Sequence, residues 1–166
     1  MARQPVDYEA LIQAAGDAVV AAGTDGSILL WNRAAERIFG YAEQEALGHS
    51  LDLIVPERFC SRHWQGYREV MRTGRTRYGA EVLRVPAVHR DGRPLSIAFT
   101  VALLYSPDEK VQAIAAVIRD ETSRWKEGRA LGQRLAELEA QCEQMRGAAA
   151  VTRAQPRDRL LKHDPR

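Results

Sequence analysis

Hydrophobic residues in the first part of the chain form short runs separated by turn residues. An apolar run at 18–22 and another within 27–32 flank the dipeptide Asp25-Gly26. Two such runs across an Asp-Gly turn are typical of a β-hairpin. The residues before the hairpin, over 6–17, have the pattern of a short helix. The chain is therefore expected to begin with a helix and two antiparallel strands.

Short helices are expected after the hairpin. Asn32 can cap the first of them, because its side-chain oxygen can accept hydrogen bonds from the unpaired amides of the first turn. This helix covers 33–39 and ends at Gly40, a residue that readily adopts the left-handed conformation found at helix ends. One or two further helical turns are expected over 43–47.

The longest helical pattern in the middle of the chain runs from Glu57 to Thr73 and ends at Gly74. Trp64 lies off its main apolar face, so its side chain is expected to point toward another element or a partner. Residues four apart share one face of a helix, and that face is formed here by Phe59, His63, Tyr67 and Met71.

Three strand-like runs complete the globular part of the chain. The first covers 80–89, and in the second, over 95–105, apolar residues alternate with small or polar ones as in a half-buried strand. The third, over 111–118, is apolar on both faces, as in a central strand. Two strands, several short helices and three strands predict an α+β fold with an antiparallel sheet and helices on one face.

The hydrophobic period changes after this last strand. A charged helix is predicted over 123–147, and its apolar residues recur at intervals of four and three, as in the seam of a coiled coil. About two heptads are marginal alone, so the seam needs a partner, either this domain or a second chain. A homodimer is predicted, because the apolar seam would otherwise be exposed. The residues 148–166 are rich in alanine and then basic, which predicts a disordered tail. The predicted dimer contacts are Leu131, Leu135, Leu138, Cys142 and Met145.

The composition excludes several classes of protein. With 166 residues, of which 45% are hydrophobic, the chain is long enough for one domain with a core. No apolar run reaches the length of a membrane span, and the first ten residues lack the pattern of a signal peptide. No nucleophile-elbow, phosphate-loop or zinc-protease motif occurs, so no enzyme activity is expected. Cys60 and Cys142 are isolated, which is typical of a reducing cytoplasm.

Charge is distributed unevenly along the chain. The formal net charge is +2, from 24 basic and 22 acidic side chains. Six basic and two acidic residues give the segment 146–166 a charge of +4, which leaves −2 for the rest. Because no aromatic residue lies among these basic residues and no helix-turn-helix pattern occurs, neither nucleic acid nor a membrane is expected as a partner.

Residues 18–122 resemble a PAS domain. Such a domain implies a five-stranded antiparallel sheet with short helices on one face, here with a helical cap over 1–17 and a C-terminal coiled-coil helix. It also implies a sensory function, in which Asp120 and Thr122 pass a signal from the sheet to the last helix. The resemblance rests on motifs in the family's order and spacing, which are Thr24-Asp25-Gly26, Trp31–Tyr41, Glu45–Gly48, Val55-Pro56-Glu57, His89–Gly92 and Arg119–Thr122.

A narrower resemblance concerns the predicted long helix. Val55-Pro56-Glu57 followed by Ser61-Arg62-His63 is similar to the haem-binding PAS domains of oxygen-sensing histidine kinases of the FixL type. In that family the histidine of this motif is the proximal haem ligand, so the resemblance implies haem b with His63 as the ligand of the iron. The residues then expected to contact the cofactor are Phe59, Tyr67, Met71, Leu83, Leu95 and Ile97.

The sequence departs from that family in two places. The position of the family's distal arginine is taken by Leu83, and the neighbouring Arg84 is expected to face the opposite side of its strand. An apolar distal side would favour carbon monoxide or nitric oxide over stably bound oxygen. No kinase domain follows, so a separate regulatory or kinase-type protein is expected as the partner.

Two alternative functions stay open. The domain could be a cofactor-free interaction and dimerisation module, with its pocket filled by side chains. It could instead bind an apolar metabolite. Flavin photochemistry is not expected, because the segment 48–53 lacks the adduct-forming cysteine of light-sensing PAS domains.

The remaining cysteine and histidine residues have simpler interpretations. Cys60 lies close to Arg58 and Arg62, which could lower the pKa of the thiol and make it redox-sensitive, or it could be a passive, half-buried thiol. His49 and His89 are expected at the surface or in turns.

Overall fold

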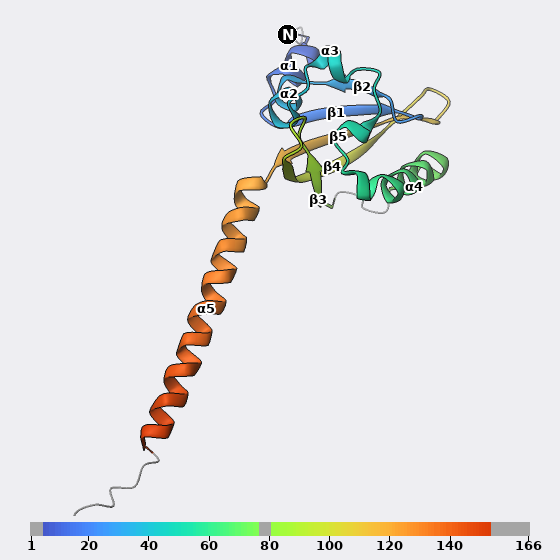
Figure 1. The fold of residues 1–166 in the computed structure, drawn as a ribbon. Coiled ribbons are helices and arrows are strands. Elements are labelled where there is room, and N and C mark those ends of the chain that lie inside the picture. The colour runs from blue at the N-terminus through green and yellow to red at the C-terminus, as the bar shows by residue number, and fades with distance from the viewer. Residues whose placement is uncertain (1–4, 77–80, 154–166) are drawn as a thin grey trace, which may run out of the picture. The chain divides into compact units, whose positions relative to one another are not determined.

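The computed structural model describes residues 5–76 and 81–153, and the side chains of those up to 146. It divides into two compact units, Met1–Ser123 and Arg124–Arg166. Figure 1 shows the elements in chain order, which are α1 (Tyr8–Ala14), β1 (Ala18–Gly23), β2 (Ile28–Trp31), α2 (Arg33–Phe39), α3 (Glu43–Ala46), the short 3-10 helix η1 (Leu51–Leu53), α4 (Glu57–Thr73), β3 (Leu83–Val88), β4 (Pro94–Tyr105), β5 (Val111–Asp120) and α5 (Thr122–Arg153).

The five strands form one sheet in the order β2-β1-β5-β4-β3, and all neighbouring strands are antiparallel. The predicted hairpin is confirmed, because β1 pairs with β2 and Gly26 lies in the turn with φ +83°. This left-handed conformation costs glycine little and strains other residues. The α+β fold with a five-stranded antiparallel sheet is therefore as predicted.

The main core lies between the sheet and the helices that follow β2. Residues directly opposite each other in antiparallel strands face the same side, so Val20 and Trp31 face this core together. Trp31 and Phe39 are completely buried, with ring centroids 5.3 Å apart. The indole N–H of Trp31 donates to the carbonyl of Tyr41 over 3.0 Å, which satisfies its polar atom inside the core.

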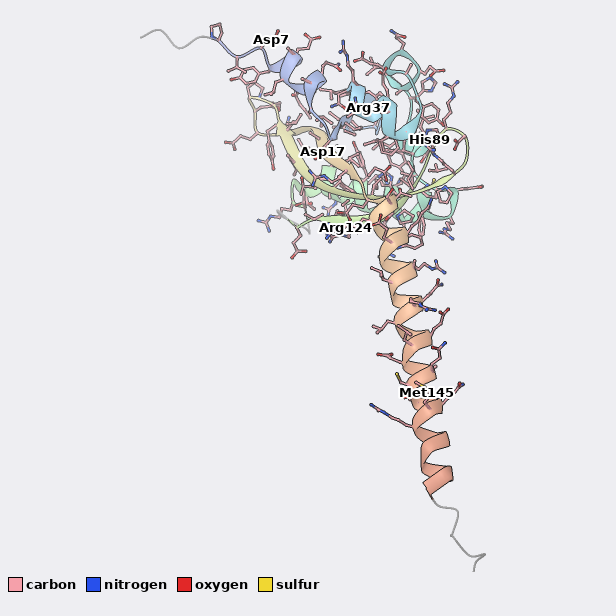
Figure 2. All side chains as sticks on the ribbon, turned by 90° about the vertical axis from the view of Figure 1, so that its left-hand side faces the viewer. Asp7, Asp17, Arg37, His89, Arg124 and Met145 are labelled. Atoms are coloured by element: carbon pink, nitrogen blue, oxygen red, sulfur yellow. The ribbon has the colours of Figure 1, made fainter. Side chains whose placement is uncertain are left out.

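Helix ends follow the residues predicted for them. The side chain of Asn32 accepts a hydrogen bond from the amide of Ala35, and Gly40 ends α2 with φ +81°. Gly74 ends α4 in the same way, with φ +64°. At the N-terminus Asp7 caps α1 by accepting from the amide of Ala10, and Figure 2 shows Asp7 and Asp17 before and after this helix.

Several boundaries differ from the prediction, for example at the first helix, which covers Tyr8–Ala14 within the expected 6–17, and at the last strand, which continues to Asp120. The strand expected over 80–89 is confined to Leu83–Val88, and residue 80 lies outside the described residues. Helix α5 continues to Arg153, past the predicted end at 147, because the alanines that follow are strong helix formers. The described part of the predicted disordered tail is thus helical, and 154–166 lie outside the described residues.

Candidate functional site

The candidate site is built on the face of α4 that was predicted from the spacing of its side chains. Tyr67 is buried, and Phe59, His63 and Met71 are half-buried, so one side of the helix is turned toward the domain. In Figure 1, α4 lies at the opposite end of the domain from α1 and α2. None of the four residues belongs to the main core cluster, so this face of α4 packs separately from it.

Polar contacts from this face hold α4 to the β1–β2 turn and to η1. The hydroxyl of Tyr67 donates to the carbonyl of Gly23 over 2.6 Å, and burial raises the pKa of Tyr67 to about 12, so it remains a donor at neutral pH. The indole N–H of Trp64 donates to the Asp52 carboxylate over 2.7 Å. A Cβ on Gly26 would lie 2.2 Å from the Trp64 ring, so the indole is packed directly on that glycine. Trp64 thus points to another element, as expected.

His63 forms a cluster of three rings with Trp64 and Tyr67, whose own centroids are 5.4 Å apart. Its imidazole centroid is 5.0 Å from that of Trp64 and 5.8 Å from that of Tyr67. Its Nδ1 is buried and has no hydrogen-bond partner among the described residues. Burial lowers the pKa of His63, against a smaller opposite effect of the Asp52 carboxylate. The ring is therefore neutral at physiological pH, the state in which an imidazole can ligate a metal.

This donor set fits haem better than a bare metal ion. Among the described residues, no group of three or more His, Cys, Asp or Glu side chains could hold a metal ion. Haem iron already has the four porphyrin nitrogens and needs from the protein only an axial ligand and apolar surroundings. A single neutral imidazole beside Phe59, Tyr67 and Met71 meets that requirement.

The predicted contacts from the sheet do not form one group. Leu95 and Ile97 are each 5% exposed and belong to the main core, together with Ile54 and Ala87. Leu83 is half-buried and pairs with Phe99. The hydroxyl of Tyr105 donates to the carbonyl of Gly74 at the end of α4, so that end of the helix lies near the far end of β4. Leu95 and Ile97, at the start of β4, are remote from this contact.

Three residues that were not predicted as part of the site lie closer to α4 along the sheet. Val101 and Leu103 continue the alternation of β4, and Leu103 pairs with Ile114 of β5. All three are half-buried and lie outside the main core cluster. The strict alternation along 95–105 places Val101 and Leu103 on the same face as Leu95 and could have identified these two, whereas Ile114 follows only from the pairing of β4 with β5.

Arg84 and Leu83 face opposite sides of β3, as predicted. Leu83 is half-buried, whereas Arg84 is exposed and donates from Nε to the Glu121 carboxylate over 3.1 Å. In this structure Arg84 contributes to the opposite face of the sheet and not to the side of α4.

The thiol of Cys60 is not activated by its neighbours. Burial is the largest effect and raises the pKa of Cys60, and the carboxylate of Asp52 raises it further. The sulfur lies 3.7 Å from the carbonyl oxygens of Val55 and Pro56, and Arg58 stacks on the ring of Phe59. The expectation that nearby arginines lower the pKa of this thiol is therefore wrong, and the structure supports the passive alternative.

Asp120 and Thr122 lie where the sheet leads into α5. The Thr122 hydroxyl accepts from the amide of Ser96 over 3.0 Å, and the Asp120 carboxylate accepts from the amide of Thr122 over 2.8 Å. Between them, the amide of Glu121 donates to the carbonyl of Ser96 over 2.8 Å. The first residues of α5 are thus bonded directly to β4.

Within the second unit, α5 carries the predicted seam. Its five residues are all exposed, and the Arg129 guanidinium lies 5.3 Å above the Trp125 ring one turn away. Exposed apolar residues at heptad spacing are the pattern of a coiled-coil seam. This stripe consists of Leu131, Leu135, Leu138, Cys142 and Met145.

Comparison with known proteins agrees with this architecture. The model of the PAS fold family matches residues 7–120, so the chain belongs to the PAS family, whose domains are typically sensory. The PAS domain of a protein from Colwellia psychrerythraea superposes with a TM-score of 0.61 at 18% identity, over 70% of this chain and 95% of that one.

Two relatives also match in sequence. An uncharacterized protein of Azorhizobium caulinodans is 30% identical over 128 residues, which is 76% of this chain and 17% of the relative. Sensor protein FixL of Bradyrhizobium diazoefficiens is 43% identical over 47 residues, 28% of this chain and 9% of the relative. The chain thus spans less than a fifth of either relative. Among the described residues, no helix is both long and apolar enough to span a membrane.

Proposed function

We propose that this chain is a sensor that binds haem b through His63 and passes the state of the haem to α5. The observation that carries the proposal is the buried, unpartnered Nδ1 of His63 on a neutral ring. The partial identity with FixL supports the same choice of cofactor. Bound haem would supply affinity for small gases or a change of redox state.

Each residue of the proposed haem site would have a separate role. His63 would hold the iron, and Phe59 and Met71 would exclude water from the same side of the cofactor. Tyr67 and Trp64 keep α4 in place through their bonds to Gly23 and Asp52. Leu83 offers no hydrogen-bond donor on the distal side, so the site would favour carbon monoxide or nitric oxide over oxygen.

The output would be carried by α5. Asp120 and Thr122 connect the sheet to this helix, and two copies would pair along the exposed seam. A separate regulatory or kinase-type protein in the cytoplasm would then recognise the dimer. We assign no catalytic residue, and neither nucleic acid nor a membrane is part of the proposal.

A second candidate is an apolar metabolite as the ligand in place of haem. It is favoured by Val101, Leu103 and Ile114, which line the inner face of the sheet but are only half-buried. An apolar ligand would complete their burial. The third candidate is a cofactor-free interaction module. It requires that protein side chains alone complete the burial of Val101, Leu103 and Ile114.

The test is an absorption spectrum of the protein purified from cells supplied with iron and a haem precursor, before and after addition of haemin. A Soret band is expected in the wild type, and it should be lost or shifted in His63→Ala. The matched control is His49→Ala, an exposed histidine that should leave the band unchanged. Absence of the band in the wild type, even with haemin, would exclude haem. Mass spectrometry of extracted ligand would then separate the two alternatives.

A further inference from the structure

Charged side chains of alternating sign lie together at the end of the sheet where α5 begins. Arg84 of β3 donates to Glu121 over 3.1 Å, and Arg119 of β5 donates twice to Asp17, over 3.1 and 2.6 Å. Ala98 of β4 is directly opposite Arg84 on one side and Arg119 on the other. The two arginines therefore flank Ala98 on the face of the sheet that points away from the main core.

The burial of this group indicates a packed arrangement. Ala98 is only 5% exposed on this outer face, whereas Ala102, further along the same side of β4, is exposed. The side chain of Glu121 is 16% exposed, against 63% for Arg84. The pKa of Arg119 is raised mainly by the hydrogen bond and charge of Asp17, and the Glu121 charge adds to this. Glu121 is thus a shielded carboxylate between two guanidinium groups.

Glu121 lies at the junction between the sheet and α5, so its ion pair with Arg84 can affect that junction. Glu121 lies between Asp120 and Thr122, and its amide donates to the carbonyl of Ser96. The Arg84–Glu121 ion pair therefore acts between Asp120 and Thr122, the two residues that connect the sheet to α5.

Arg84 is also connected to the inner face of the sheet. It follows Leu83, which faces the opposite side and pairs with Phe99. Strand β3 is at the edge of the sheet, and its only neighbour among the described strands is β4. Among the described residues, its one backbone bond outside the sheet, from the Val88 amide to the Ile54 carbonyl, is at the end remote from Leu83 and Arg84, so the start of β3 can move with the loss of few hydrogen bonds. A ligand that displaces Leu83 would move Arg84 in the same step, because the two residues share one peptide bond.

We propose that Arg84 is a positioning residue that couples β3 to the start of α5 through its ion pair with Glu121. While the pair is formed, it holds the first residues of α5 against the sheet. Movement of β3 weakens the pair and frees them. This inference rests on the proposed sensory function for its trigger, but the pair itself exists without a ligand and can be tested without one.

The first experiment measures amide hydrogen exchange by NMR in the full chain without ligand. Arg84→Gln is expected to speed exchange of the Glu121 and Thr122 amides by about two- to fivefold. The matched control is Arg93→Gln, which removes an arginine of similar exposure from the turn after β3. Equal exchange in the two variants would overturn the proposal.

A double variant tests whether the two side chains act as a pair. If they do, Arg84→Gln combined with Glu121→Gln should exchange no faster at Thr122 than Glu121→Gln alone. Independent, additive effects of the two substitutions would show that Arg84 acts elsewhere and would overturn the proposed coupling.

Added haemin separates this inference from the proposed function. Arg84→Gln should bind haemin with the wild-type Soret band, because Arg84 faces away from His63, but the change in Glu121 exchange on binding should be smaller. Arg84→Gln could show the wild-type Soret band while haemin changes the Glu121 exchange rate equally in both proteins. That result would overturn the role of Arg84 and leave haem binding intact. No band in the wild type would contradict the haem proposal, and the ligand-free comparison would still decide the role of Arg84.

Discussion

The side-chain amide of Asn32 donates to the carbonyl of Ile12 over 2.9 Å, and so joins the start of α2 to the N-terminal helix. The same amide donates to Asp17, and the side-chain oxygen accepts from the amides of Val19 and Ala35. Asn32 is completely buried and uses all four of its hydrogen-bonding positions. It therefore fixes α1, β1 and α2 relative to one another.

Removal of this side chain should be costly. Asn32→Ala removes a hydrogen bond from the amides of Val19 and Ala35 and from the carbonyls of Ile12 and Asp17, of which Ile12 keeps a bond from the Ala15 amide, and we expect it to lower the free energy of unfolding by about 3 kcal/mol. Urea unfolding followed by tryptophan fluorescence measures the change. The control is Gln44→Ala, at an exposed position, which should alter stability by less than about 0.5 kcal/mol. A loss in Asn32→Ala no larger than in the control would contradict this role.

The contact between Gly26 and Trp64 can be tested with two glycines. Gly26 and Gly48 both have positive φ, +83° and +77°, but only Gly26 has a side chain packed on it. Gly48→Ala should cost about 1 kcal/mol from backbone strain alone. Gly26→Ala should cost about 2 kcal/mol more, because the Trp64 ring must move away.

Fluorescence gives the second measurement for this pair. A displaced Trp64 loses its bond to Asp52 and becomes more exposed, so the emission of Gly26→Ala should shift to longer wavelength, while that of Gly48→Ala should not. Equal losses of stability with unchanged emission in both variants would mean that the ring has room to move.

The two cysteines should differ in reactivity. Burial and the Asp52 carboxylate raise the pKa of Cys60, whereas Cys142 is exposed. Because the thiolate is the reactive form, iodoacetamide at pH 8 should alkylate Cys142 first, as measured by mass spectrometry of peptides. Asp52→Asn removes the negative charge and should speed the reaction of Cys60 without affecting Cys142. Faster labelling of Cys60 than of Cys142 in the wild type would contradict the passive thiol.

The lowered pKa of His63 predicts how stability depends on pH. Burial disfavours the charged ring in the folded chain, so the unfolded chain binds the proton more readily. The contribution of His63 to stability is therefore complete above the unfolded pKa of about 6.5 and is lost as the pH falls below that value. The loss of stability between pH 7.5 and pH 5 should be smaller in His63→Gln than in the wild type, by urea unfolding. Parallel curves for the two proteins would contradict a buried, neutral ring.

The sequence predicts the elements of this fold well, because each has a local signal. Asn32 and Gly40 mark the two ends of α2, and the spacing of Phe59 and His63 gives the inner face of α4. The site is less predictable, since it depends on which end of the sheet α4 approaches. No local pattern shows that the contact runs from Gly74 to Tyr105, and for that reason the predicted Leu95 and Ile97 lie instead in the main core.

The direction in which the pKa of Cys60 is shifted could not be predicted from its neighbours in the sequence either. Arg58 and Arg62 are close along the chain, but the group that faces the thiol is Asp52 in η1, eight residues before it. Burial and a carboxylate from another element thus act together to raise this pKa, with burial the larger effect. Arg84 is a similar case, because its partner Glu121 lies 37 positions further along the chain.

The seam of α5 predicts a dimer that a single charge should break. Leu135 is the second of the five residues of the stripe and is exposed in the single chain, so a second copy must bury it if the chain dimerises along this seam. Leu135→Asp would place a carboxylate between two helices, where burial of an unpaired charge is strongly unfavourable. Light scattering at tens of micromolar should then give the mass of a dimer for the wild type and of a monomer for the variant. Gln133→Asp adds the same charge on the opposite side of the helix and should remain dimeric. A wild-type monomer would remove the seam as an interface, and dimers in all three proteins would assign the interface to another surface.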